Sequence, residues 1–519
     1  MGLILPGPPR LLEAQGTAMS EAWVGSETEL YLRALSINAP SRRDLWSLRP
    51  FSPASIDAWS ADSVGAHPWK SHFERVRGRS RFILLRPSAS MTYNSTLPWG
   101  FNDGAVWQGK GLTGWASGGL AWNAGALSMR LEPTVFLAQN APFDLLNTQP
   151  GKTIFADEMR PFDIDLPQRF GEGHYGRLDP GQSHIRIDVR GATAGISTEN
   201  VAWGPALRNP LLLGSNAPGI PQLFLGTSTP LSTPVGRFQG RVMYGKLSES
   251  AWSPVAPDKR FGTGFIGAWS PLAGGLELGV ARFYHKYWPS RLDRSTALAP
   301  FGSVFADPSL TAATADNQLG VVFGRVVSTS AGFEVFGEFG KNDRNNDLRD
   351  VIAEPDHNSA WSVGFLKTLG LPAAGSFWTV RGELLDGRVT SLQRVRGQST
   401  FYDHDILAEG HTMLGQLLGS PLLERTGGAE LSMDRWTARG REGLVLTARL
   451  LPIDLQEGST ASLARTQWAL EMNSTRFMGR ADLSYKAGIL MDLNRTQGRD
   501  VRSLFTGLSW RGATTDPTH

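Results

Sequence analysis

Cysteine, long apolar runs and an excess of charge of either sign are all absent from this 519-residue chain. Without cysteine the chain can form no disulfide, no thiolate metal site and no cysteine nucleophile. No stretch of about 18 consecutive apolar residues occurs, so the sequence predicts no transmembrane helix. Because 51 basic and 48 acidic residues nearly cancel, the sequence shows no charge pattern typical of nucleic-acid binding.

Motifs for catalysis and for metal binding are also missing. The chain has no HExxH pair and no GxSxG turn before a helix. Glu334 and Glu338 could in principle act as the two carboxylates of a glycosidase, but their spacing on one strand face is better explained as lining of an interior. The sequence therefore predicts no enzyme, no cofactor and no metal site.

Glycine and aromatic residues are abundant, with 59 Gly, 17 Trp and 25 Phe. From about residue 81 onward, apolar and polar residues alternate in many short segments. A period of two places the apolar side chains on one face of a β-strand and the charges on the other. The clearest examples are residues 184–190, 235–247, 378–384, 467–473 and 482–489.

Short turns and long loops separate these segments. Turn residues occur at 123–125, 273–275 and 373–375, and the longer loops are 141–182, 289–316, 342–358 and 389–431. Tight turns at one end and long loops at the other are typical of an outer-membrane β-barrel, here with roughly 16 to 18 strands. A soluble β-sandwich or propeller would also show alternation.

Two features favour the membrane barrel over the soluble alternatives. Trp residues lie near predicted strand ends, as in the aromatic girdles of membrane barrels: Trp252, Trp288, Trp361, Trp378 and Trp510. The strands also lack the longer continuous apolar runs that a soluble fold of this size would need. In a membrane barrel, a charge that faced lipid at the bilayer centre would cost about 2–4 kcal/mol, so the charged faces must point inward. Arg282 is an exception, because it interrupts an apolar strand face.

The N-terminal part has a different pattern. In residues 20–78, Ser26 and Glu29 could cap a helix, and prolines separate further short helices around 41–59. We therefore expect a small helical module at 20–78, a barrel at 79–511 and a polar tail at 512–519. Residues 1–19 lack the features of a signal peptide, or they are the remnant of one that begins upstream.

The most informative stretch is residues 196–225, between two alternating segments. It is rich in Pro, Gly and Asn, so it predicts a long loop rather than a regular helix or strand. Loops of this length in a compact fold are usually functional.

This loop resembles the Wzi capsule-assembly family through Ser197–Asn200, Trp203–Pro205, Arg208–Pro210 and Ser215–Pro218. Two other stretches resemble the same family. They are Asn102–Gly111, and the group Phe401–His404, Gly410–Thr412 and Gly415–Gln416. Together the similarity covers most of the chain from about Tyr31 to Trp510. The resemblance implies a mainly β protein, a transmembrane antiparallel barrel of about 18 strands with a small N-terminal helical plug on the periplasmic side.

Sugar binding needs aromatic faces for C–H surfaces and amide, carboxylate and guanidinium groups for hydroxyls. The three stretches supply such groups, which become candidates for polysaccharide binding or for organising the loops: Asn102, Asp103, Trp107, Gln108, Lys110, Glu199, Asn200, Trp203, Arg208, Asn209, Asn216, Tyr402, His404, His411 and Gln416. As an alternative for each, Asn, Asp and Gly are ordinary loop formers, and Glu199 could pair with Arg208 to hold its loop closed. The two histidines are better explained by ordinary hydrogen bonding than by a metal.

By resemblance, the sequence predicts a monomeric outer-membrane protein of a Gram-negative bacterium that binds and anchors capsular polysaccharide or exopolysaccharide through its extracellular loops. Its other partners would be outer-membrane lipid and lipopolysaccharide, with no nucleic acid. Two alternatives are a porin-like channel that uses a polar lumen and a membrane-embedded glycan hydrolase or lyase.

Overall fold

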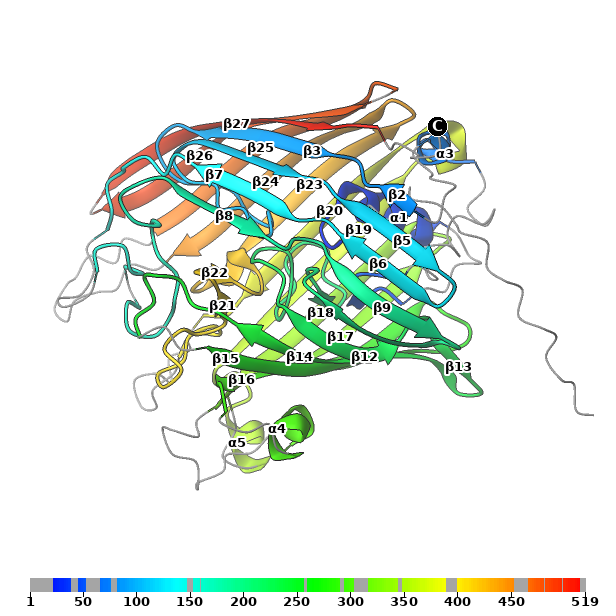
Figure 1. The fold of residues 1–519 in the computed structure, drawn as a ribbon, viewed down its shortest axis with the longest axis horizontal. Helices are drawn as coiled ribbons and strands as arrows, with labels where there is room; N and C mark the ends of the chain where they lie inside the picture. The colour runs from blue at the N-terminus through cyan, green and yellow to red at the C-terminus, as the bar shows by residue number, and fades with distance from the viewer. Residues whose placement is uncertain are drawn as a thin grey trace, which may run out of the picture.

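The computed structural model describes residues 22–38, 45–52, 66–75, 82–146, 153–158, 160–255, 259–289, 294–302, 316–343, 348–388, 399–451, 465–479, 481–496 and 498–513. Antiparallel strands close into one barrel, in which β27 pairs with β3 (Figure 1). The predicted fold class, a mainly β antiparallel barrel, is confirmed. Among the described residues, no helix is long and apolar enough to cross a membrane.

The strands of the barrel wall are β2 (Phe82–Leu84), β3 (Ser88–Asn94), β4 (Gly111–Ser117), β5 (Leu120–Ala124), β6 (Leu127–Leu131), β7 (Thr134–Ala138), β8 (Tyr175–Asp179), β9 (His184–Val189), β10 (Ala192–Ser197), β12 (Gln222–Thr227), β13 (Leu231–Thr233), β14 (Gly236–Leu247), β15 (Arg260–Ser270), β16 (Leu276–Tyr287), β17 (Asp316–Ser328), β18 (Phe333–Asn342), β19 (Ser359–Leu369), β20 (Ser376–Asp386), β23 (Gly427–Thr437), β24 (Gly440–Leu451), β25 (Arg465–Phe477), β26 (Asp482–Thr496) and β27 (Arg499–Arg511). Two short pairs lie apart from the wall, β1 (Leu48–Arg49) with β11 (Ala202–Trp203), and β21 (Thr412–Met413) with β22 (Gln416–Leu417). The helices are α1 (Glu27–Ile37), α3 (Lys70–Arg75), α4 (Arg294–Leu298) and α5 (Leu348–Ala353), with 3-10 turns η2 (Ala299–Phe301), η4 (Pro372–Ala374) and η6 (Pro421–Leu423).

Several early crossings of the wall are split into two strands that run end to end. β4 pairs with β7 and its continuation β5 pairs with β6, while β6 continues into β7. The breaks fall at Pro87, Gly119, Pro133 and Pro180. Proline has no N–H for the ladder, and a Cβ at Gly119 would overlap the Leu131 carbonyl oxygen, so these residues explain why the ladder is interrupted there.

The two ends of the barrel differ. Connections such as 125–126, 190–191 and 438–439 are tight, and they form what we name the short-turn end, on the right of Figure 1. The opposite long-loop end carries the connections after β3, β7, β10 and β20. At the tight turn between β9 and β10, Arg190 and Gly191 both adopt positive φ, which suits a two-residue hairpin turn.

Apolar side chains cover the outer face of the wall. One row of cross-strand neighbours runs from Val280 through Val322 and Phe339 to Trp361, and all four side chains are exposed. Trp288, Trp378 and Trp510 are exposed as well, as the girdle prediction requires. Trp252 is not part of this girdle, because it lies in the loop after β14 and packs on Phe170 and Tyr175.

The outward-facing Arg282 does not meet lipid directly. Its guanidinium donates to the carbonyl oxygens of Pro300 (3.2 Å) and Gly302 (2.7 Å), and it also bonds Gln318. Phe301 stacks on Phe265 of β15 with 4.9 Å between ring centroids. The segment 294–302 therefore covers this arginine from outside, where α4 and α5 lie beyond the wall in Figure 1.

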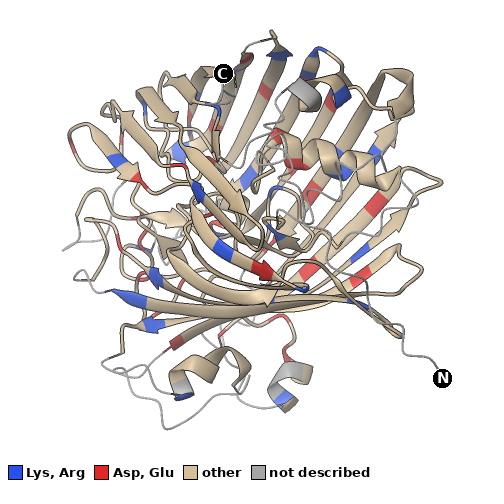
Figure 2. Cartoon of the chain, turned by 45° about the vertical axis from the view of Figure 1, so that its right-hand side comes forward, with Lys and Arg blue, Asp and Glu red and all other residues tan. Residues whose placement is uncertain are grey.

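The charged faces of the strands point inward, as predicted, but charges are not all that fills the interior. Figure 2 shows acidic and basic residues on neighbouring wall strands. Many of these side chains are buried, among them Glu334, Glu338 and Arg381. Between them lies a large apolar core. It includes Trp203, Leu211, Met243, Phe283 and Tyr402, all buried.

The N-terminal residues pack inside the wall at the short-turn end. Ser26 caps α1 by accepting from the backbone N–H of Glu29, as predicted. Arg33 of α1 donates through Nε to Glu334 of β18 over 2.7 Å, and both side chains are fully buried. Tyr31 stacks on Trp69 at 4.2 Å. The prediction of short helices within 41–59 is wrong for the described residues 45–52, which contain strand β1 because Leu48 and Arg49 pair with Trp203 and Ala202. The rest of that region, the segment 1–19 and the end of the 512–519 tail lie outside the described residues.

Candidate functional site

The loop 198–221 folds into the barrel instead of standing above it. Inward-facing carboxylates of the wall hold its backbone: Glu338 accepts from the N–H groups of Ala206 (3.0 Å) and Leu211 (2.8 Å). Glu383 accepts from the N–H of Leu207 (2.6 Å) and from the Asn209 amide (2.7 Å). Because N–H groups compensate these buried charges, the loop and the wall fix each other.

Trp203 is the central apolar side chain of this loop and has 0% exposed surface. It lies in β11, which pairs with β1, so it joins the N-terminal module to the loop. A Cβ on Gly264 would come within 2.8 Å of its ring, so glycine is what allows the indole to lie against the β15 backbone. In this structure Trp203 presents no face to a ligand.

The predicted amide residues connect three loops. Asn200 donates to the carbonyl oxygens of Gly214 (3.2 Å) and Ala217 (2.8 Å). Asn216 donates to Leu417 (3.1 Å) and accepts from the N–H of Asn102 (3.3 Å). The Gln416 amide donates to the carbonyl oxygens of Gly104 (3.3 Å) and Asn216 (3.0 Å). The structure thus brings together the three stretches singled out in the sequence, through side-chain amides that bond backbone groups.

The suggested pairing of Glu199 with Arg208 is wrong. Glu199 instead lies 2.9 Å from Nδ1 of His184, and Arg208 lies 3.3 Å from Glu430. Although burial raises the pKa of Glu199, the facing His184 lowers it to about 2. Glu199 and Arg208 therefore each join the loop to a wall strand, and they do not pair with each other.

Tyr402, His404 and His411 support the same packing from the loop after β20. The Tyr402 hydroxyl donates to the Leu211 carbonyl oxygen (2.8 Å) and accepts from the N–H of Ser420 (2.9 Å). Nε2 of His411 contacts the carbonyl oxygen of Leu212 at 2.7 Å, and burial lowers the pKa of His411 to about 4. His404 accepts from the N–H groups of Ile406 and Leu407 through Nδ1. Within the described residues, no group of three or more His, Asp or Glu side chains could hold a metal ion.

Asp103, Gln108 and Lys110 lie in the loop after β3. Gln108 donates to Asp103 over 2.7 Å, and burial raises the pKa of this carboxyl group. Lys110 donates to the Pro142 carbonyl oxygen over 2.8 Å. Asn102, Asp103 and Arg208 also line an internal cavity of about 380 Å³ between α1 and the wall, together with charged residues of β20 and β23–β26.

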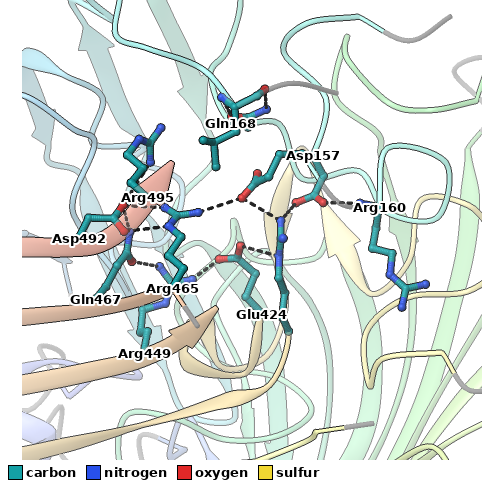
Figure 3. A network of polar contacts seen from close by, with 12 residues as sticks. Asp157, Arg160, Gln168, Glu424, Arg449, Arg465, Gln467, Asp492 and Arg495 are labelled. Atoms are coloured by element: carbon teal, nitrogen blue, oxygen red, sulfur yellow. Dashed lines mark hydrogen bonds and ion pairs between the residues drawn. The ribbon is translucent and has the colours of Figure 1, made fainter. Parts of the chain in front are cut away.

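An ionic network fixes the loop after β7 to the wall at the long-loop end (Figure 3). Arg425 lies 2.7 Å from Asp157 and 3.1 Å from Glu158. Arg465 contacts Glu158 (3.1 Å) and Asp492 (2.7 Å). This network holds the segment that carries Phe170.

Trp107, Phe170, Tyr175 and Trp252 form a cluster that we name the aromatic patch. Phe170 stacks on Tyr175 at 4.2 Å, Trp107 lies 4.9 Å from Phe170, and Trp252 meets Phe170 edge-on at 5.4 Å. Phe170 is buried, and the other three side chains remain partly exposed at the long-loop end. Sequence reasoning found Trp107 and assigned Trp252 to the girdle, but it missed Phe170 and Tyr175, since their loops are distant in the chain and carry no common motif.

No protein-family model matches the chain, and no curated protein matches its sequence. Among solved structures, the chain is similar to Wzi of Escherichia coli, described as an outer-membrane protein involved in group 1 capsule assembly and as a carbohydrate-binding β-barrel. The TM-score is 0.63 at 12% identity, covering 94% of this chain and 98% of that chain. The two proteins share a fold.

Two other solved barrels are weaker likenesses. OccAB3 of Acinetobacter baumannii has a TM-score of 0.41 at 7% identity, with 84% of this chain and 99% of that chain covered. OccK1 of Pseudomonas aeruginosa has a TM-score of 0.39 at 9% identity, with 84% and 98% covered. The likeness to Wzi confirms the mainly β antiparallel barrel that the sequence resemblance implied.

Proposed function

We propose that this protein is an outer-membrane barrel that binds surface polysaccharide at its long-loop end, without catalysis. The observation that carries the proposal is the aromatic patch, which lies partly exposed on a closed barrel whose outer wall is apolar. Such a wall suits acyl chains, and the long loops of outer-membrane barrels face outward. The likeness in fold to a carbohydrate-binding barrel supports the same function.

The chemistry of the patch suits a sugar. Indole and phenol rings offer flat apolar faces to the C–H surface of a pyranose and lose little entropy when they are held by neighbours. Arg177 lies beside them and donates to the Ala105 carbonyl oxygen over 3.0 Å. Weak binding at each copy is enough, because a polymer engages many copies at once.

The filled lumen favours binding over conduction. Loop 198–221 and α1 occupy the interior, with Trp203 and Arg33 fully buried between the walls. We infer that the N-terminal module acts as a plug at the short-turn end, which would face the periplasm. The buried amide and histidine candidates then act by organising the loops, and Trp107 is the member of the predicted set that contacts the ligand.

Replacing Trp107 and Trp252 together by alanine tests this site. We expect retention of the native polysaccharide on cells or vesicles to fall about tenfold or more, since each lost aromatic contact is worth about 0.5–1.5 kcal/mol beyond its buried area. The matched control is Trp378→Ala, which removes an exposed indole near the short-turn end. Unchanged retention in the double variant, with the barrel still heat-modifiable, would exclude the patch as the binding site.

Two further measurements separate this proposal from the alternatives. A channel would conduct in a planar bilayer, whereas a plugged binding protein should be nearly silent. A hydrolase or lyase would shorten the polysaccharide, and we expect its length distribution to stay unchanged after incubation with purified protein.

A further inference from the structure

The outer wall carries a groove of about 940 Å³ across strands β14 to β19. Its lining is almost entirely apolar, and a volume of this size is typical of ligand pockets. Elsewhere on a barrel, neighbouring outward side chains usually fill the space between them. A hollow in a lipid-facing wall therefore needs a cause in the sequence.

Glycine supplies that cause. Two adjacent outward rows cross the groove: Gly267, Val280, Val322, Phe339 and Trp361 in one, and Trp269, Leu278, Gly324, Gly337 and Val363 in the other. Gly324 and Gly337 are direct cross-strand partners, so the second row has no side chain at its centre. The side chains of Leu278 and Val363 lie beside these two glycines, close to where their Cβ atoms would be, and only partly fill the space above them.

The walls of the groove are held in place. The Trp269 indole donates to the Val235 carbonyl oxygen over 3.0 Å, which pins the ring to the turn before β14. Leu278, Val322 and Val363 are exposed along its length. Because the Trp269 edge of the groove is already ordered, it loses little conformational freedom when a ligand lies against it.

The end of the groove at β19 lies near the long-loop end and becomes amphipathic. Trp361 stands there, and Lys341 follows on the same face of β18, two residues beyond Phe339. The Lys341 ammonium group donates to the carbonyl oxygens of Glu354 (3.3 Å) and Pro355 (3.4 Å), so it lies beside α5. Tryptophan and lysine are the residues that mark the boundary between acyl chains and lipid head groups.

We propose that this groove binds one acyl chain of a phosphorylated glycolipid of the outer leaflet, with the phosphate near Lys341. The inference rests on the proposed placement of the barrel in an outer membrane. It is favoured by the continuity of the groove with the apolar belt and by the positive charge at its outer end. The bound lipid would fix the barrel against the leaflet that the polysaccharide covers.

Gly267→Leu is the direct test. A Cβ at Gly267 meets no heavy atom within 4 Å, so the added side chain fits into the groove without disturbing the wall. Val363→Phe fills the same space from the other side. The matched control is Gly114→Leu on the outward face of β4, where a Cβ would come no closer than 3.9 Å to its nearest neighbour.

The full chain is extracted from its membrane in mild detergent, and bound lipid is counted by native mass spectrometry after titration with lipid A or with phosphatidylethanolamine. We expect one lipid A per barrel for the native chain and for Gly114→Leu. Retention of lipid A should be about tenfold lower in both groove-filling variants, because several methylene groups of the acyl chain lose their contact with the groove. Lys341→Gln should weaken lipid A binding and leave phosphatidylethanolamine binding unchanged.

Equal lipid retention by Gly267→Leu, Val363→Phe and the native chain would overturn the proposal, and so would equal binding of phosphatidylethanolamine and lipid A. Heat-modifiable migration and fractionation with the outer membrane report the barrel itself. If the native chain failed those two assays, the proposed function would fall. If lipid binding is absent while both assays give the result expected of an outer-membrane barrel, only the groove proposal fails.

Discussion

Two tryptophans, Trp378 and Trp203, show how differently the outer wall and the lumen of this barrel are built. Trp378 is 40% exposed on the outside, near a short turn, whereas Trp203 is 0% exposed within a loop at the centre of the barrel. The outer wall is a repeating surface on which most large apolar side chains are partly exposed in similar environments. The lumen is a packed core in which each side chain has its own set of contacts. The same residue type should therefore contribute more to the free energy of unfolding in the lumen than on the wall.

The largest expected effect is at Trp203. Trp203→Ala leaves a cavity among buried residues and should lower the free energy of unfolding by about 3–5 kcal/mol. Trp378→Ala should cost only a fraction of this, because the side chain is partly exposed on the wall. Urea unfolding in lipid vesicles would measure both, and equal losses would contradict the distinction between wall and core.

A charge on the outer wall should be the next most costly change. Leu470 is exposed on β25 between Leu446 and Ile489, and Leu470→Arg should cost about 2–4 kcal/mol if this row lies near the bilayer centre. The loss should be seen in vesicles, with Leu470→Met as a control of similar volume. A neutral result would mean that this face does not meet lipid.

The contribution of the packed loops to stability should depend on pH, whereas the contribution of the outer wall should not. Burial lowers the pKa of His411 from 6.5 to about 4, so the unfolded chain binds a proton more readily between these values. Stability should therefore fall as the pH drops from 6.5 towards 4, by at most about 3 kcal/mol.

His411→Gln isolates this contribution. The amide can still donate to the Leu212 carbonyl oxygen but does not titrate. Burial raises the pKa of the nearby Asp403 to about 6, which acts in the opposite sense, so the informative quantity is the difference between the native chain and the variant at each pH. A difference that does not vary with pH would exclude a buried neutral His411.

The smallest effect is expected at an exposed ion pair near the short-turn end. Arg476 and Glu442 contact each other with both side chains almost half exposed. Arg476→Ala should change the free energy of unfolding by less than about 1 kcal/mol, since solvent screens such pairs. A much larger loss would show that this part of the wall is built like the lumen.

The alternation of apolar and polar residues by itself determined the two faces of the wall strands. A period of two at 184–190, 235–247 and 482–489 fixed which side chains point outward, because strand geometry leaves only two faces and lipid accepts only one kind of side chain. Ser26 likewise predicted the start of α1, since a cap depends on residues three apart. The sequence resemblance also found the three loops that meet inside the barrel.

What those loops do was decided by tertiary structure. Polar loop composition suggested residues facing outward, yet Asn200, Asn209 and Trp203 are buried, because wall carboxylates such as Glu338 and Glu383 bind the loop backbone from more than 120 residues away. The partners of Trp107, namely Phe170, Tyr175 and Trp252, come from separate parts of the chain. Local periodicity carries no information about such contacts, because they depend on where closure of the barrel places each loop.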